Sequence, residues 1–337
     1  MFEWGKFPVG KFPVDDSGYM AFDGSEEVVG ILRRCFPCGS APTFWSVNWI
    51  AALLHLFNAL VTLILWSVDE NKDNTYSLSE TAVPWYNSSK TTNCTTGLPK
   101  GAMFPFQVSD EYCIYRIDNI TSKLSLWWLV IAFHFLSFCF QALSMTQWDL
   151  PICRSRCIRE NYVQEVDNYG TNTLRMIEYS ISATLMQIAI ALVLGIWNRL
   201  VIIGVAFLTV VTMLLGLIAE QLRHDRKNMA WVAHFTGWIS MGGVWIILGR
   251  QFLYTIEVSS SSNTQPPKFV YIVVMVIGIL YCGFGLIQFF QLYCSPKKNS
   301  PQFNRKIEMA YTANSLTSKT FLGWIIFANA LTGMSQS

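Results

Sequence analysis

The sequence contains few charged residues. Only 14% of its 337 residues are Asp, Glu, Lys or Arg, whereas an ordinary soluble domain has about 25%. This shortage argues against a soluble protein, and the lack of a stripe of basic and aromatic residues argues against nucleic acid binding. The first residues, MFEWGKFPVG, lack the apolar stretch of a signal peptide. We therefore expect the first apolar helix to direct membrane insertion.

Apolar residues make up 52% of the chain and gather in long runs. About 20 helical residues cross the hydrocarbon of a bilayer at 1.5 Å per residue. The runs predict membrane helices at 44–67, 125–146, 173–197, 200–220, 229–250, 269–293 and 307–332. We expect an all-α membrane protein, with residues 1–43 as an N-terminal segment, residues 44–337 as one seven-helix domain, and a long loop at 68–124.

The distribution of basic residues predicts the orientation of this bundle. Fourteen Lys and Arg residues lie in segment 1–43 and in the second, fourth and sixth connections, against eight in the other connections. Since basic residues favour the cytoplasmic side, we expect the N-terminus inside and the C-terminus outside.

The loop at 68–124 contains all three acceptor triplets for N-glycosylation, at Asn87, Asn93 and Asn119. Their clustering supports an extracellular loop and a glycoprotein. The same loop contains Cys94 and Cys113, which the oxidising side allows either to pair or to stay free.

Four further cysteines lie on the predicted cytoplasmic side, at Cys35, Cys38, Cys153 and Cys157. Two close pairs are compatible with a tetrahedral zinc site. Palmitoylated or simply reduced thiols next to the membrane are the commoner outcome, and we favour that interpretation.

Lys319 is the one lysine that lies inside a predicted membrane helix, about 12 residues or 18 Å from its start. A charge at that depth is costly, so it indicates a functional group. A desolvated lysine is a nucleophile toward aldehydes and forms a Schiff base with them. Retinal is such an aldehyde, and the sequence therefore predicts a retinal-binding lysine.

A protonated Schiff base needs a nearby carboxylate, and Glu178 in helix 173–197 is the candidate. Counting residues along the helices puts Glu178 shallower than Lys319. Arg175 lies one turn away on the same face as Glu178. Glu308 is predicted either to pair with Arg175 or to be an ordinary interfacial carboxylate, and Glu220 is expected at the interface.

Three histidines allow a different class of function. His55, His134 and His234 lie in the first, second and fifth predicted helices. If they met at one depth they would suggest a zinc-dependent intramembrane hydrolase. That function leaves Lys319 without a purpose, so we favour histidines that line a cavity and expect no enzymatic activity.

Two segments carry a family resemblance: Arg175–Ser182 (RMIEYSIS) and Ser315–Lys319 (SLTSK). They resemble the heliorhodopsins, whose inverted topology agrees with the orientation counted above, and residues 48–58 are also similar. The resemblance implies all-trans retinal on Lys319, Glu178 as its counterion and a homodimer. It further implies a retinal site that includes Ser315, Tyr179, Ser182, His55, Ser137 and Gln141, where Gln141 replaces a histidine of the family.

The retinal polyene needs a flat apolar sleeve, and Trp245 and Phe284 are the predicted walls. The residues before Trp245, Gly242-Gly243-Val244, depart from the glycine and proline of the family. We therefore expect no proline kink in that helix.

The carboxylates bear on what the protein does with light. A pump needs titratable groups on both sides of the Schiff base. The candidate carboxylates are Glu178, Glu308 and Glu220, and none of them lies in the predicted extracellular half of the bundle. We expect a light sensor in the plasma membrane of a eukaryotic cell, read by an unidentified signalling protein. A light-activated proton channel through these glutamates is the alternative.

Overall fold

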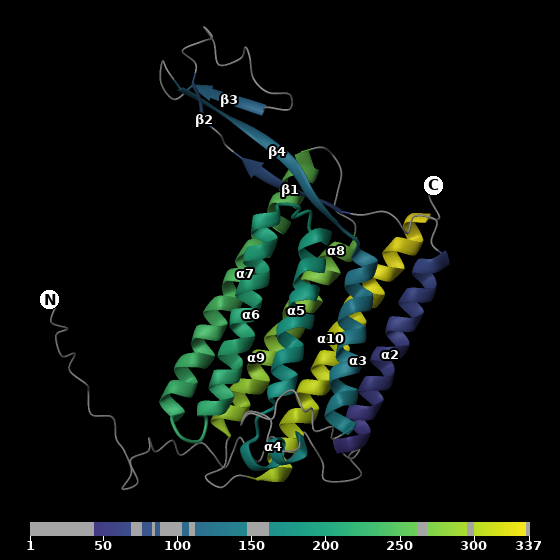
Figure 1. Cartoon of the computed structure of the whole chain (residues 1–337), viewed down its shortest axis with the longest axis vertical. Coiled ribbons are helices and arrows are strands. Elements are labelled where there is room, and N and C mark those ends of the chain that lie inside the picture. Colours follow the sequence, from purple (N-terminus) through teal and green to yellow (C-terminus); the bar gives the residue numbers. More distant parts are fainter. Residues whose placement is uncertain are drawn as a thin grey trace, which may run out of the picture. The chain divides into compact units, whose positions relative to one another are not determined.

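The computed structural model describes residues 44–68, 76–82, 85–87, 103–107, 112–146, 162–261, 268–294 and 300–334, which belong to one compact unit. Most of them are helical (Figure 1). The helices are α2 (Phe44–Val68), α3 (Leu126–Thr146), α4 (Tyr162–Tyr169), α5 (Thr173–Val193), α6 (Arg199–Leu222), α7 (Lys227–Ser261), α8 (Lys268–Ile272), α9 (Gly278–Tyr293) and α10 (Pro301–Met334). A π-helical segment, η3 (Val273–Ile277), joins α8 directly to α9.

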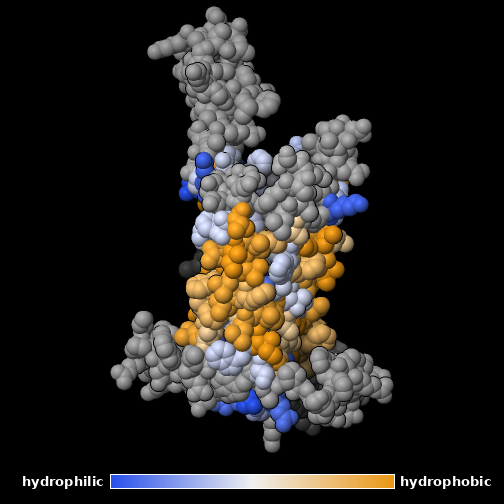
Figure 2. Space-filling model, turned by 90° about the vertical axis from the view of Figure 1, so that its right-hand side faces the viewer, coloured by the Kyte–Doolittle hydropathy of each residue, from blue (hydrophilic) through white to orange (hydrophobic). Residues whose placement is uncertain are grey.

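Among the described residues, six helical spans are long and apolar enough to cross a membrane. They lie in α2, α3, α5, α6, α7 and the continuous helix formed by α8, η3 and α9, close to the first six predicted ranges. Figure 2 shows the apolar belt that these helices present between two more hydrophilic ends. The seventh predicted helix corresponds to α10, which has sufficient length. Polar residues such as Asn314, Thr317 and Lys319 lower its hydropathy, and it is not among the six.

Two helix ends differ from the prediction. Helix α5 ends at Val193 instead of 197, because Gly195 adopts a left-handed φ of 80° and the Ile196 N–H donates to the Ala191 carbonyl at 2.9 Å. This is the Schellman end that glycine permits. Helix α10 begins at Pro301 instead of 307, and proline is favourable in the first turn of a helix because its missing N–H is not needed there.

The predicted all-α architecture is wrong in the long loop, which contains a four-stranded antiparallel sheet. Its longest strand, β4 (Tyr112–Leu124), pairs with β1 (Tyr76–Ala82), β2 (Trp85–Asn87) and β3 (Met103–Gln107). Isoleucines and tyrosines give β4 a high β propensity. The Ser79 N–H of β1 also donates to the Trp197 carbonyl at 2.9 Å, which ties the sheet to the α5–α6 turn.

Several predictions on cysteines and glycosylation lie beyond what the structure describes. Cys94, Asn93, Cys35, Cys38, Cys153 and Cys157 are outside the described residues. The backbones of Cys113 and Asn119 lie in β4 and that of Asn87 lies in β2, but their side chains are not described.

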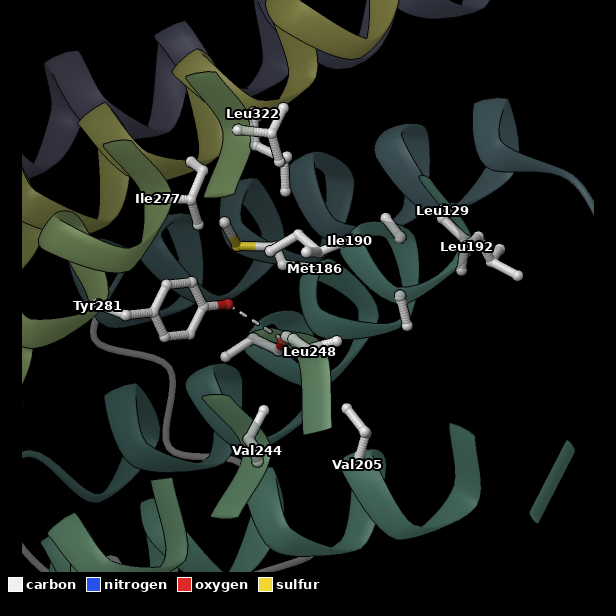
Figure 3. Packing of buried hydrophobic residues seen from close by; sticks show 14 of the residues in the cluster. Leu129, Met186, Ile190, Leu192, Val205, Val244, Leu248, Ile277, Tyr281 and Leu322 are labelled. Carbon is white, nitrogen blue, oxygen red and sulfur yellow. Dashed lines mark hydrogen bonds between the residues drawn. The ribbon is translucent and has the colours of Figure 1, made fainter. Parts of the chain in front are cut away.

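Helix α5 occupies the centre of the bundle. In the apolar window of each span, 61% of the α5 residues are buried inside the protein, against 22% to 39% in the other five. It contacts α3 on one side and α6 on another, while α10 packs against α2 and α9. Figure 3 shows the apolar core in which Met186 and Ile190 of α5 face Val244 and Leu248 of α7 and Tyr281 of α9. The polar site next to this core is therefore built on α5 and its neighbours.

Candidate functional site

Lys319 of α10 lies in the interior of the bundle with 2% of its surface exposed. Its ammonium donates a hydrogen bond to the Ser137 hydroxyl of α3 at 2.6 Å and forms an ion pair with the Glu178 carboxylate of α5. Glu178 is 3% exposed. Three helices thus bring one cation, one anion and one hydroxyl together away from water.

Two serine hydroxyls hold the carboxylate of Glu178. Ser137 Oγ lies 2.5 Å from Glu178 Oε1, and Ser182 Oγ of the next turn of α5 lies 3.3 Å from the same oxygen. The oxygen that meets Lys319 is therefore surrounded by donors. Such a buried pair is favourable when its hydrogen-bonding capacity is met, and removal of one partner leaves a buried charge that is strongly destabilising.

The contact between Lys319 and Glu178 forms despite the depth difference counted from the sequence. Lys319 lies about 10 Å deeper than Glu178 when residues are counted from the predicted helix starts. The Cα–Cβ bond of a helical residue points toward the N-terminus of its helix. The long side chain of Lys319 therefore reaches back along α10, toward the end of the bundle at which α5 begins.

An aromatic cavity adjoins this pair. The Lys319 Nζ atom lies 5.1 Å from the centre of the Tyr179 ring, and Tyr179 lines a cavity between α5, α6, α7, α9 and α10. Phe284 packs edge-on against Tyr179 at 5.4 Å between ring centres and also lines the cavity. Trp245 is outside the lining residues and packs behind Tyr281 at 6.0 Å. A buried amine next to an aromatic, largely apolar cavity fits a retinoid aldehyde.

The remaining predicted residues lie near the pair without a hydrogen bond to it. Ser315 is fully buried one turn before Lys319, and Gln141 is buried one turn after Ser137. His55 of α2 pairs instead with His134 of α3, with 3.0 Å between their Nδ1 atoms. The sequence did not predict this histidine pair, because it depends on how α2 packs against α3.

The arrangement required for a zinc hydrolase is absent from the described part of the chain. His234 bonds to Gln288 of α9 at 2.9 Å and lies apart from the pair formed by His55 and His134. Within the described ranges, no three His, Cys, Asp or Glu side chains lie close enough together to hold a metal ion.

A second ionic cluster lies toward the start of α5. Arg175 pairs with Glu308 of α10 and donates to Glu220 of α6 at 2.5 Å. Its guanidinium also lies 4.0 Å above the centre of the Tyr311 ring. Glu220 lies in the last turn of α6, and its side chain has no exposed surface within the protein. Glu220 is the one acidic residue in α6, and that isolation is the signal in the sequence that could have indicated its burial.

The short helix α4 is held by hydrogen bonds at the end of the bundle where α5 begins. Arg223 donates to the Tyr169 carbonyl at 2.8 Å, and Arg305 forms two hydrogen bonds with the Asp167 carboxylate, at 2.7 and 2.5 Å. The hydrogen bond to Asp167 raises the pKa of Arg305. Burial and the neighbouring charge of Arg223 lower the pKa of His224.

Comparison with solved structures gives the class of the fold. The transmembrane domain of Salpingoeca rosetta rhodopsin phosphodiesterase matches with a TM-score of 0.54 at 11% identity, over 91% of this chain and 89% of that chain. A second structure, of that transmembrane domain with its linker region, gives 0.53 at 11% identity, over 92% and 77%. The fold is thus that of rhodopsin transmembrane domains. No curated protein matches the sequence.

The family model for heliorhodopsin matches residues 44–331, and the chain belongs to this family. This result confirms the resemblance seen in the sequence. Membership implies a retinal chromophore and an integral membrane protein.

We expect Arg175→Leu to destabilise the protein by about 3–5 kcal/mol, because it leaves two buried carboxylates, Glu220 and Glu308, without their cation. Arg305→Gln is the control, since its side chain is 43% exposed and a surface pair contributes about 0–1 kcal/mol. Denaturant unfolding in detergent measures both variants. Equal losses in the two would contradict the structural importance of the Arg175 cluster.

Proposed function

We propose that the protein is a light sensor that carries all-trans retinal on Lys319 as a protonated Schiff base, with Glu178 as the counterion. The observation that supports this most directly is the buried pair of Lys319 and Glu178 beside the cavity lined by Tyr179 and Phe284. A lysine whose amine is surrounded by protein is suited to a covalent bond with an aldehyde.

Retinal, when bound, supplies the absorption of visible light and a change of shape. The protein contributes the surroundings of the nitrogen. Glu178 balances its positive charge, while Ser137 and Ser182 hold the carboxylate oxygen in place. Both charged groups are almost fully buried, and the low dielectric of these surroundings strengthens the attraction between them.

A series of contacts connects the retinal site with the end of the bundle next to α4, where a signalling protein would detect the change. The Tyr179 hydroxyl donates to the Tyr311 carbonyl at 3.1 Å, and the Tyr311 ring lies under Arg175. Arg175 in turn holds Glu220 and Glu308. A shift of the Tyr179 ring would therefore reach α6 and α10, whose ends are fastened to α4.

The proposal includes the membrane arrangement. Helix α10 would be the seventh crossing, with the N-terminus and α4 in the cytoplasm and the sheet outside, as the count of basic residues favours. We further propose a homodimer in the plasma membrane of a eukaryotic cell, glycosylated at Asn87, Asn93 and Asn119, that acts on an unidentified signalling protein. No enzymatic activity is proposed.

A light-activated proton channel is the second candidate. The complete burial of Glu220 favours it, because Glu220 joins Glu178 and Glu308 as a third buried carboxylate between the Schiff base and the α4 end. Vectorial pumping is disfavoured because, among the described residues of the spans, no buried carboxylate lies on the other side of Lys319.

Purified protein given all-trans retinal should absorb visible light, and Lys319→Ala should abolish the absorption band because it removes the amine. Lys306→Ala, on the exposed start of the same helix, should keep the band at the wild-type height. Absorption spectroscopy measures the visible band of the wild type and of both variants. A colourless wild type would overturn the proposed function.

Glu178→Gln should move the absorption band to longer wavelength. The carboxylate stabilises the charge while it is localised at the nitrogen, so its removal narrows the gap to an excited state in which the charge has moved along the polyene. Glu308→Gln, at a carboxylate that pairs with Arg175, should leave the band in place. A band that moves in Glu308→Gln and stays in Glu178→Gln would assign the counterion differently.

Illumination of voltage-clamped cells distinguishes sensor from channel. A sensor should pass no sustained current at any voltage. A current that reverses at the proton equilibrium potential would support the channel, and Glu220→Gln should then reduce it. A sustained current against that potential would exclude both candidates in favour of a pump.

A further inference from the structure

A chain of three hydrogen bonds forms part of the cavity wall on the α7 side. The Trp238 indole N–H donates to His234 Nε2 at 3.0 Å, and His234 Nδ1 lies 2.9 Å from Gln288 Oε1. Gln288 Nε2 donates to the Gly216 carbonyl at 2.8 Å. All four residues line the cavity, and the chain links α7 with α9 and α6.

The chemistry of these groups fixes the state of His234. An indole nitrogen can only donate, so His234 Nε2 must accept. The ring proton then lies on Nδ1 and is donated to Gln288 Oε1. This orientation turns the Gln288 amide nitrogen toward Gly216, as the structure has it. Every donor in the chain therefore points in one direction.

Protonation of His234 would break this chain. A proton on Nε2 would turn this atom from an acceptor into a donor. The Trp238 N–H, which lies 3.0 Å away, would then have no acceptor in His234. The rings that pack on His234 are those of Trp231, Phe235 and Trp238 from α7 and Phe289 from α9, and none is ionisable near neutral pH. Apart from His234 itself, the ionisable side chains that line the same cavity are the tyrosines Tyr179, Tyr281 and Tyr311.

The neutral histidine holds the Trp238 indole against Gly285. A Cβ atom at position 285 would lie 2.3 Å from Trp238 Cζ2, so the indole rests directly on the backbone of α9. Trp238 is thereby fixed by a hydrogen bond at one edge and by close packing on its other ring. The chain begins at an indole and ends at a backbone carbonyl, neither of which exchanges protons readily. Its role is therefore positional.

Trp238 lines the cavity from α7, which packs on α6 and α9. Lys319 belongs to α10, which packs on α2 and α9. The lining residue Tyr179 connects Lys319 to the cavity, since its ring centre lies 5.1 Å from the Lys319 Nζ atom. A long ligand attached at Lys319 that passes Tyr179 and fills the cavity would meet Trp238 in the α7 wall.

We propose that His234 is a positioning residue that, through Trp238, sets the far wall of the cavity and so determines which retinoid rings fit. The inference rests on the proposed retinal function. It assigns the ring end of the ligand to the α7 wall and predicts that this wall rejects retinoids with an enlarged ring.

Binding of two ligands tests the proposal: all-trans retinal, and an analogue in which a bicyclic aromatic ring replaces the cyclohexenyl ring. Titration of the visible band gives the ratio of their half-saturating concentrations for each variant. His234→Phe should reduce the preference for retinal about fivefold, the factor expected for one net hydrogen bond. His234→Gln keeps an acceptor for Trp238 and should retain the preference. His224→Phe, a matched change outside the cavity lining, should also retain it.

An unchanged ratio in His234→Phe, or an equal loss in His234→Gln, would overturn the proposal. Nitrogen NMR of retinal-free protein labelled in its four histidines gives a second readout that does not depend on the pigment. The signal lost in His234→Phe should be that of a neutral ring with its proton on Nδ1. A proton on Nε2 in that signal would refute the hydrogen-bond chain. A colourless wild type would refute the proposed function, whereas a coloured one with an unchanged ratio would refute this inference alone.

Discussion

The structure depends on one buried ion pair. Lys319 and Glu178 each carry a charge into a region where an unpaired charge is costly, and each is tolerated because the other is present. Ser137 completes the arrangement by contacting both groups. The pair therefore specifies how α3, α5 and α10 meet, and the chemistry of the site follows from the same contact that determines the packing.

The contact between α5 and α10 is ionic at two levels. Glu178 and Arg175 lie one turn apart on α5, and their partners on α10 are Lys319 and Glu308. The signs are reversed between the two levels, so a slip of one helix along the other would bring like charges together. Apolar contacts alone would tolerate such a slip more easily. The two ion pairs therefore disfavour a shift of one helical turn between α5 and α10.

Features that depend on local composition could be predicted from the sequence. The six apolar spans, Lys319 in an otherwise apolar run and Glu178 as its candidate partner need no knowledge of packing. The strands at 76–82 and 112–124 were missed because their pairing joins distant and polar segments. The burial of Glu220 and the bonds of His234 depend on which faces of α6, α7 and α9 meet, and helical periodicity in one sequence does not reveal this.

The hydrogen bond between β1 and the Trp197 carbonyl also affects the opposite end of α5. The sheet clamps the turn that follows α5, and Glu178 and Arg175 lie in the first two turns of that helix. A rod that is clamped at one end moves most at the other. A tilt of α5 about this turn would therefore displace Glu178 and Arg175 more than the residues next to the sheet.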